Sequence, residues 1–285
     1  NINFKIDMLL KRGFIIFYFL GVVLHLCASG DSQFIIDLKG KWNFSFDNKA
    51  YNDEVILPGT TDTNKKGKVN ENRNETTFLS RYYKFEGRAW YSKDVVIPKS
   101  WDGKVIRLFM ERTRPTKVWV DDKYVGSNSF LSTPHVYDLS GFISPGKHRI
   151  IVMVDNGDGI PSQIRSSSHS CTESTQTNWN GIIGRIELQA LNKLHIKSVQ
   201  VYPDAEKRQA RVRIVTSIDE GIAGEKVVMS ADAFNTKKKH SVKPLEILLK
   251  DGKSVYELDY DLGKKALFWS DADPALYRLN VAIVG

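Results

Sequence analysis

Residues 117–126, which read KVWVDDKYVG, give the first indication of the fold. The β-branched and aromatic residues of 117–120 are typical of a strand, and the Asp121-Asp122 pair that follows is a turn signal. The same pattern continues outward on both sides, where short runs alternate in period two between turns rich in Gly, Pro, Asn and Asp. We expect further strands at residues 42–46, 89–95, 105–110, 148–154, 182–188, 195–202 and 211–218.

Helix is expected to be minor, because no stretch keeps apolar residues at helical spacing over three turns. Short strands at regular spacing predict an all-β fold of mostly antiparallel β-sandwiches. A boundary is expected within residues 190–193, dividing the mature chain into a domain at 31–190 and a domain at 191–285. The second block has the size of an immunoglobulin-like β-sandwich.

The composition is that of a globular protein. The 285 residues are 41% hydrophobic and 26% charged, with a formal net charge of +8. These values exclude a disordered chain and a bundle of membrane spans. The positive charge is scattered, and its one dense run, residues 237–240, is interpreted as a solvated turn between strands. Nucleic-acid binding needs basic residues clustered on one face, so no nucleic-acid partner is expected.

The first thirty residues predict a secretory signal peptide (1–30), with residues 1–7 as upstream read-through before the start at Met8. A basic pair is followed by an apolar run at 14–26 and then by small residues. We therefore expect a secreted or periplasmic protein. The residues before Cys27 loosely resemble a bacterial lipobox, so a lipid anchor to the bacterial envelope at Cys27 is an alternative to plain cleavage.

The sequence offers little recognisable chemistry. It has no phosphate-binding loop, dinucleotide fingerprint or serine-hydrolase elbow, so no cofactor is expected. His169, Cys171 and Glu173 alternate, but zinc sites usually need four ligands in paired spacings. Residues 155–159 do not begin an EF-hand, which would need Glu at its twelfth position, where this chain has Ser166. No metal site and no catalytic carboxylate pair is identified from the residues.

Several segments resemble glycoside hydrolase family 2, which includes β-galactosidases, β-glucuronidases and β-mannosidases. The opening strand of that family, its Leu-Pro-Gly turn and its central Trp-Tyr strand resemble residues 37–44, 57–60 and 89–95. Residues 101–104 resemble the next turn of the family, and residues 118–126 resemble a characteristic hairpin. Residues 152–156 resemble a strand that ends in Asp-Asn, and residues 178–185 resemble a closing loop with its strand. Residues 269–279 resemble the last strand. The resemblance spans about residues 35–285, in the family's order.

The resemblance implies a jelly-roll (galactose-binding-like) β-sandwich, then an immunoglobulin-like β-sandwich, then a catalytic TIM barrel with the two glutamates of a retaining mechanism. The chain ends where that barrel should start. We therefore expect the N-terminal, non-catalytic portion of a secreted, β-galactosidase-like hydrolase of O-glycosyl bonds in carbohydrate metabolism, which is inactive by itself. Its implied partners are a β-glycoside substrate and its own missing barrel, and an oligomer is left open.

The resemblance also implies that the polar loop before the last strand of the sugar-binding domain reaches the barrel. Its candidate substrate-binding residues are Thr175, Asn178, Trp179 and Asn180. Family members often carry a carboxylate where this chain has Thr175, and Glu173 nearby could substitute for it. The two Asn could bond sugar hydroxyls while Trp179 stacks on a ring. Alternatively, and in keeping with Asn as a turn former, they shape the turn and Trp179 packs between domains.

Two other functions are compatible with these domains. One is a stand-alone carbohydrate-binding surface module without hydrolase activity, and the other is a structural adhesin without affinity for sugar. Fold alone does not choose among them. Coding sequence beyond Gly285 that continues into alternating strands and helices would favour the hydrolase, whereas a stop codon there would favour the module.

Overall fold

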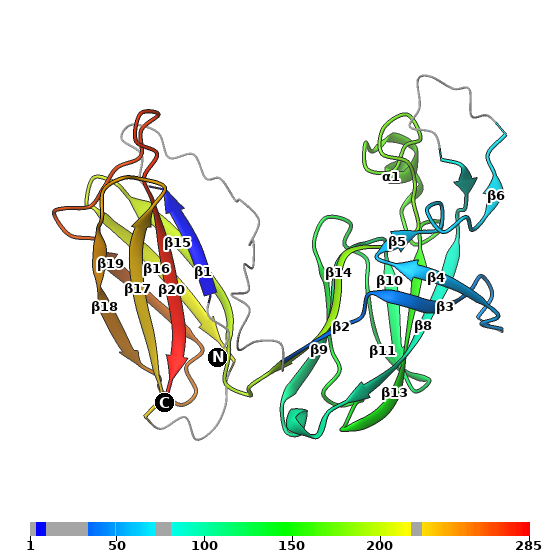
Figure 1. Cartoon of the computed structure of the whole chain (residues 1–285), viewed down its shortest axis with the longest axis horizontal. Helices are drawn as coiled ribbons and strands as arrows, with labels where there is room; N and C mark the ends of the chain where they lie inside the picture. The colour runs from blue at the N-terminus through cyan, green and yellow to red at the C-terminus, as the bar shows by residue number, and fades with distance from the viewer. Residues whose placement is uncertain (1–3, 10–33, 49, 72–80, 218–223) are drawn as a thin grey trace. The chain divides into compact units, whose positions relative to one another are not determined.

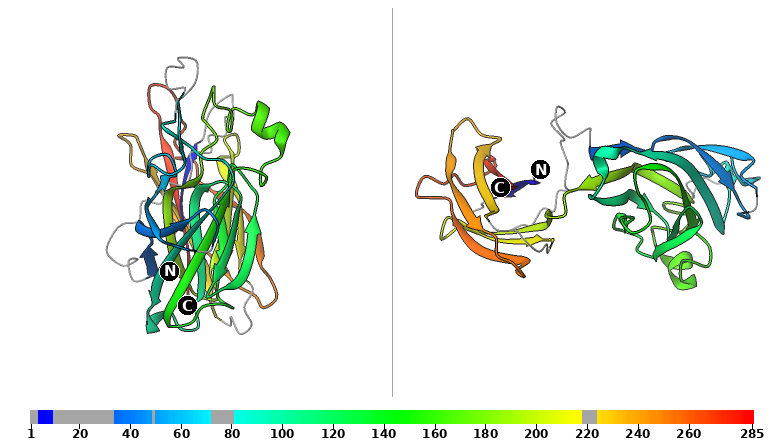
Figure 2. Two further views of the ribbon diagram at one scale, coloured as in Figure 1. Left: turned by 90° about the vertical axis from the view of Figure 1, so that its right-hand side faces the viewer. Right: turned by 90° about the horizontal axis from the view of Figure 1, so that it is seen from below.

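The computed structural model describes residues 4–9, 34–48, 50–71, 81–217 and 224–285. One compact unit is Ser32–Ala190, and the other contains Leu191–Gly285 with Phe4–Leu9 from the N-terminal residues. Each unit is a β-sandwich in which two sheets face each other (Figure 1; Figure 2). Within the described ranges, no helix is both long enough and apolar enough to cross a membrane.

The predicted strand and turn at residues 117–126 form a hairpin in the first unit. β10 (Thr116–Val120) pairs antiparallel with β11 (Lys123–Asn128). Asp121 and Asp122 between them have φ of 46° and 66°, the positive values that a tight hairpin turn needs to match the strand twist. The hairpin is the edge of a six-stranded sheet, in the order β11-β10-β13-β8-β3-β4. Its other strands are β3 (Gly40–Ser45), β4 (Asp53–Leu57), β8 (Arg88–Ile97) and β13 (Gly146–Asp155).

A five-stranded sheet forms the other layer of the first unit, in the order β12-β9-β14-β2, with β5 paired to β14. Its strands are β2 (Ile35–Asp37), β5 (Gly59–Thr60), β9 (Val105–Thr113), β12 (His135–Asp138) and β14 (Gly181–Leu191). The unit also contains a two-stranded ribbon and two short helices, namely β6 (Lys68–Val69), β7 (Tyr83–Lys84), η2 (Lys99–Trp101) and α1 (Ser162–Ser167).

The period-two pattern explains the core of this unit. Val118 and Val120 are fully buried, whereas Lys117 on the same strand is exposed. Across the sheet, Trp42 and Tyr91 are each 1% exposed and belong to the same cluster. Fully burying an apolar side chain of this kind contributes about 1.5–3 kcal/mol, so the alternation fixes which face of each strand turns inward.

The second unit is a smaller sandwich. A four-stranded sheet in the order β1-β20-β17-β18 faces a three-stranded sheet in the order β15-β16-β19. Its strands are β1 (Phe4–Leu9), β15 (Ile196–Asp204), β16 (Gln209–Thr216), β17 (Lys226–Phe234), β18 (Ser241–Leu248), β19 (Val255–Asp261) and β20 (Leu276–Val284). The predicted fold class, an all-β chain with a jelly-roll sandwich followed by an immunoglobulin-like sandwich, is confirmed. The lysines of 237–240 lie in the exposed connection between β17 and β18, as predicted.

The structure describes only part of the segment that was predicted to be a signal peptide. β1 pairs antiparallel with β20, whereas the apolar run 14–26 and Cys27 lie outside the described residues. The signal peptide and the lipid anchor therefore stay predictions.

The core of the second unit can be tested by comparing two leucines from one sheet. Leu279 on β20 is fully buried, and Leu248 on β18 is 54% exposed. Replacing Leu279 with Ala should lower the free energy of unfolding by about 3 kcal/mol, because it removes buried surface and leaves a cavity. Leu248→Ala should change it by less than about 0.5 kcal/mol. Urea unfolding of both variants measures the difference, and equal losses would contradict the assigned core.

Candidate functional site

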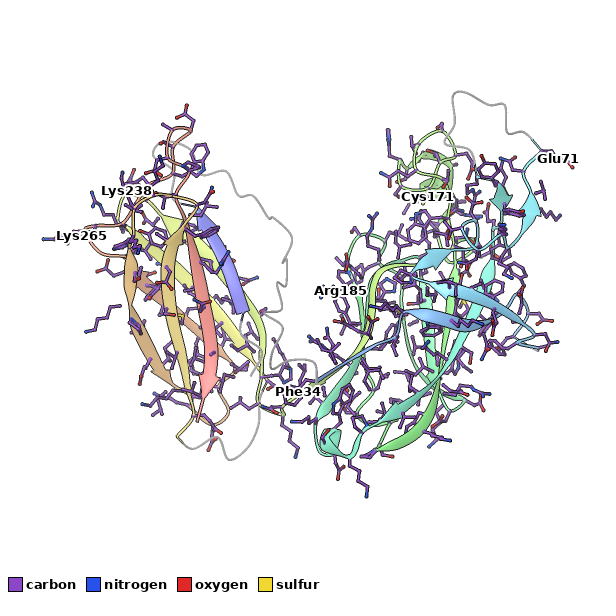
Figure 3. The ribbon with its side chains drawn as sticks, viewed as in Figure 1. Phe34, Glu71, Cys171, Arg185, Lys238 and Lys265 are labelled. Carbon is purple, nitrogen blue, oxygen red and sulfur yellow. The ribbon has the colours of Figure 1, made fainter. Side chains whose placement is uncertain are left out.

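All four candidate substrate-binding residues lie in the loop between β13 and β14, residues 156–180, which contains α1. β13 belongs to the six-stranded sheet and β14 to the five-stranded sheet, so this loop crosses from one layer to the other. Figure 1 shows α1 at the same end of the first unit as β6, and Figure 3 shows Cys171 and Glu71 there. We call this part of the molecule the loop end.

Three buried asparagines bond the loop to the six-stranded sheet and to the segment before β8. Asn180 donates from Nδ2 to a β13 carbonyl at 3.0 Å and accepts from the Tyr91 hydroxyl at 2.9 Å. Asn156 donates from Nδ2 to the carbonyls of Phe85 and Asn178 at 2.9 and 2.7 Å. Asn178 donates back to the Asn156 carbonyl at 2.7 Å. Since Asn156 and Asn180 are fully buried and Asn178 is 6% exposed, these side chains shape the loop.

Arg81 ties the loop to the segment that leads into β7. Its Nη1 donates to the Asn178 carbonyl at 2.6 Å, and its Nη2 and Nε donate to the Glu173 carboxylate at 2.6 and 3.3 Å. Such two-point pairing between a guanidinium and a carboxylate is strong and directional. Glu173, the carboxylate near Thr175 in the sequence, is therefore held in an ion pair with Arg81, whose side chain is 8% exposed.

Arg114 holds the loop from another side. Its guanidinium lies 4.4 Å from the centroid of the Trp179 ring and donates to the carbonyls of Ser170, Trp179 and Thr177 at 2.5, 3.3 and 3.3 Å. Burial lowers the pKa of Arg114, but the high starting value of a guanidinium keeps it charged at neutral pH. The cation therefore covers one face of Trp179, and the ring as a whole is only partly exposed.

Thr175 closes a turn at the partly exposed side of the loop. Its hydroxyl donates to the His169 carbonyl at 2.5 Å and lies 2.7 Å from the Thr172 hydroxyl. The structure therefore brings the four candidates together in one loop, but two of them are partly exposed and two are buried. Thr175 and Trp179 keep exposed surface, whereas Asn178 and Asn180 are buried.

The residues considered for metal binding have other contacts. Cys171 is buried, with its Sγ 3.5 Å from the Ser170 hydroxyl, and Glu173 pairs with Arg81. Asp155 accepts from the Gly157 N–H at 2.8 Å, as in an ordinary turn. In the part of the chain that the structure describes, no group of three or more His, Cys, Asp or Glu side chains is arranged to hold a metal ion.

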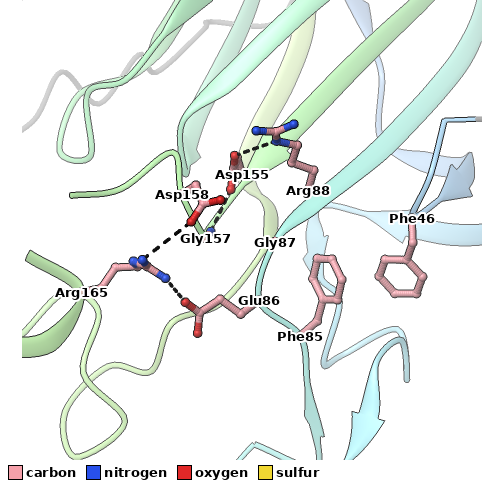
Figure 4. Close-up of a pocket in the computed structure, with 9 residues that line it drawn as sticks. All are labelled: Phe46, Phe85, Glu86, Gly87, Arg88, Asp155, Gly157, Asp158 and Arg165. Atoms are coloured by element: carbon pink, nitrogen blue, oxygen red, sulfur yellow. Dashed lines mark hydrogen bonds and ion pairs between the residues drawn. The ribbon is translucent and has the colours of Figure 1, made fainter. Parts of the chain in front are cut away.

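Two open hollows lie beside Phe85 and Glu86. One has a volume of about 860 Å³ and is lined by Arg81, Glu173 and residues of the β6–β7 ribbon. The other has a volume of about 550 Å³ and is lined by aromatic and charged side chains (Figure 4). Both fall in the range of about 300–1,000 Å³ that is usual for small-molecule sites.

The roles of Arg81, Arg114 and Asn156 were not predicted from the sequence. A local signal exists for two of them, because Arg114 and Asn156 directly follow β9 and β13 at the ends where those strands reach the loop. Polar residues placed just after strands gather at one edge of a sandwich, and loops there hold binding residues more often than the core does. Arg81 precedes a two-residue strand and carries no such signal.

The anchoring role of Arg114 can be tested against Arg112, an exposed arginine two residues away. Arg114→Gln should lower the free energy of unfolding by about 2 kcal/mol, because charge-assisted bonds to three carbonyls are lost. Hydrogen exchange should become faster in residues 168–180. Arg112→Gln should leave both measurements unchanged. Unaltered exchange in the Arg114 variant would contradict this role.

Comparisons with known proteins agree with this architecture. The family described as glycosyl hydrolases family 2, sugar binding domain, matches residues 35–189. A β-galactosidase of Thermoanaerobacter pseudethanolicus is 24% identical over 257 residues, which are 87% of this chain and 31% of that protein. A family 2 glycosyl hydrolase structure from Bacteroides cellulosilyticus has a TM-score of 0.60 and 18% identity, over 88% of this chain and 34% of that one.

The β-glucuronidase structure of Faecalibacterium prausnitzii has a TM-score of 0.59 and 16% identity, over 88% of this chain and 44% of that one. At such identities the likeness concerns the fold. The chain spans less than a third of the length of the curated relatives that it matches. The family match covers more than half of the chain and almost all of Ser32–Ala190. The chain therefore belongs to glycosyl hydrolase family 2, and its first unit is the sugar-binding domain of that family.

Proposed function

We propose that this chain is the N-terminal, non-catalytic part of a secreted β-glycosidase. The main support is how much of this chain matches the sugar-binding family, and how little of the curated relatives this chain covers. The sugar-binding family matches residues 35–189 of the first unit, whereas the matched part of the chain spans only 18% to 31% of the length of the curated relatives. In such an enzyme, the two sandwiches would support a catalytic barrel, and the apolar run at 14–26 would direct export.

The carboxylates of the loop end support a non-catalytic role. Hydrolysis with retention needs two carboxyl groups about 5–5.5 Å apart, one of them free to act as a nucleophile. Here Glu173 pairs with Arg81, Asp155 with Arg88, and a third carboxylate, that of Glu86, with an arginine of α1. These groups are engaged in holding the loop end together, and the catalytic pair would come from the barrel.

Within the candidate set, Thr175 and Trp179 are the residues that we propose contact substrate. Both keep exposed surface, and Trp179 is fixed by the guanidinium of Arg114. Asn178 and Asn180 would act as positioning residues, because their amides are buried and bond other parts of the chain. A fixed aromatic ring orients a sugar at little entropic cost, which favours catalysis by positioning.

The substrate would be a β-glycoside. A β-galactoside follows from the resemblance in the sequence, and a β-glucuronide is the competing substrate, because relatives with both names share this architecture. A stand-alone carbohydrate-binding module is the second candidate function, and the hollow lined by aromatic and charged side chains favours it. The two functions differ in whether a longer protein cleaves its ligand.

The hydrolase proposal predicts a difference between two lengths of the protein. The 285-residue chain alone should release no nitrophenol from aryl β-galactoside or β-glucuronide, whereas the same protein extended by a downstream barrel should release it from one of them. A colorimetric assay against heat-inactivated protein measures both. Release by the short form would contradict the assignment of catalysis to the barrel. Binding without hydrolysis by every length would favour the module.

The role of Trp179 can be tested in the extended protein. Trp179→Ala should lower kcat/KM for an aryl β-glycoside about tenfold, because one stacking contact is lost, while the melting temperature changes little. Trp119→Ala is the matched control, since Trp119 is also partly exposed but stacks on Trp90 and Tyr124 of the six-stranded sheet. Equal effects of the two substitutions, or unfolding of the Trp179 variant, would favour a packing role for Trp179.

A further inference from the structure

We infer that the hollow of about 550 Å³ between Phe46 and Arg165 is a second sugar-binding site, and that it accepts a neutral hexopyranoside (Figure 4). The inference rests on the proposed function for its ligand class, because that function makes the domain a carbohydrate-binding one. It does not depend on Thr175 or Trp179, neither of which lines this hollow, nor on the catalytic activity that the proposed function assigns to the barrel.

One wall is a fixed aromatic surface. The rings of Phe46 and Phe85 have their centroids 4.3 Å apart, and Phe46 also packs edge-on against buried Phe44 at 4.8 Å. Phe46 nevertheless stays 43% exposed. The apolar faces of a pyranose ring pack well against such a surface, and the ring contacts keep Phe46 ordered before a ligand arrives.

The floor of the hollow is polar and rigid. Asp155 is 5% exposed, and its carboxylate accepts from Arg88 Nε at 3.2 Å and from the Gly157 N–H at 2.8 Å. A Cβ on Gly157 would lie 3.0 Å from the Gly87 Cα, so the backbone segments meet more closely than side chains would allow. The Arg88 side chain is 62% exposed. Its Nη groups can therefore donate to sugar hydroxyls while Nε donates to the Asp155 carboxylate.

The opposite rim carries acceptors. Arg165 of α1 forms ion pairs with Glu86 and with Asp158, the latter at 3.9 Å (Figure 4). The Glu86 and Asp158 side chains remain 51% and 89% exposed. Their remaining carboxylate oxygens can accept from hydroxyl groups, which complements the donors of Arg88 across the hollow.

The charge of the lining decides between neutral and acidic sugars. Three carboxylates, those of Glu86, Asp155 and Asp158, face two guanidiniums, those of Arg88 and Arg165, so the net formal charge is −1. A uronate would add a second negative charge to a site that already has an excess, and like charges at close range weaken binding. A neutral ring pays no such penalty, so the hexopyranoside should bind in preference to its uronate.

The test measures binding of matched sugars to the 285-residue chain by isothermal titration and saturation-transfer NMR. Methyl β-glucopyranoside and methyl β-galactopyranoside are each compared with the corresponding uronate, which differs only at C6. The neutral sugar of at least one pair should bind more tightly than its uronate. Phe46→Ala should weaken that binding about tenfold. Phe130→Ala is the control, because Phe130 is 67% exposed in the same unit and does not line the hollow.

Arg88→Gln is the second variant and covers the case in which Phe46→Ala disturbs the fold. It should also weaken binding of the neutral sugar. The fold should be retained, because the Gln amide can still donate to the Asp155 carboxylate, and circular dichroism checks this. The inference is overturned if neither neutral sugar binds, if both variants bind like the Phe130 control, or if the uronates bind more tightly. If no sugar binds at this hollow but the extended protein hydrolyses a glycoside, the inference fails and the proposed function stands. If the neutral sugar binds here but the extended protein hydrolyses no glycoside, the inference stands and the proposed hydrolase function fails.

Discussion

The buried amide of Asn180 is the contact on which the loop end of the first sandwich depends. Asn180 directly precedes β14 of the five-stranded sheet, yet its side chain bonds Tyr91 and Val154 of the six-stranded sheet. The next residue must be glycine, because Gly181 has φ of 143° and a Cβ there would lie 2.3 Å from the Gly59 carbonyl oxygen. The two layers are therefore joined at a point where the chain has almost no freedom, and the loop approaches from a fixed direction.

The loop that ends at Asn180 has little regular structure, so its carbonyls need hydrogen-bond donors other than those of a strand ladder. Arg81 and Arg114 supply them from opposite sides. Burying a guanidinium costs free energy unless its donors are bonded, and here carbonyls, the Glu173 carboxylate and the Trp179 ring face the two cations. The arrangement keeps the loop ordered, which is what a surface that orients a sugar needs.

Local pattern was sufficient to predict the sandwiches. The hairpin at Asp121 and Asp122 needs only near neighbours, and period-two alternation gives the buried face of each strand. The loop end could be located by resemblance, but the roles within it could not be predicted. Whether Asn180 bonds a sugar or the chain depends on Tyr91, 89 residues away, and whether Glu173 is available depends on Arg81, 92 residues away. Such partners are set by the tertiary fold.

The turn at Asp155 and Asn156 lies between the loop and the hollow of about 550 Å³. Asp155 forms the floor of the hollow, whereas the next residue, Asn156, bonds the loop at the Asn178 carbonyl. Asn156 is held to Gly87, whose N–H donates to the Asn156 side chain at 2.9 Å and whose carbonyl accepts from the Asn156 N–H at 3.2 Å. A ligand at the proposed site that fixed Arg88 over Asp155 would therefore restrain the backbone that positions the loop. Since coupling of this kind is reciprocal, order in the loop would in turn favour the formed hollow.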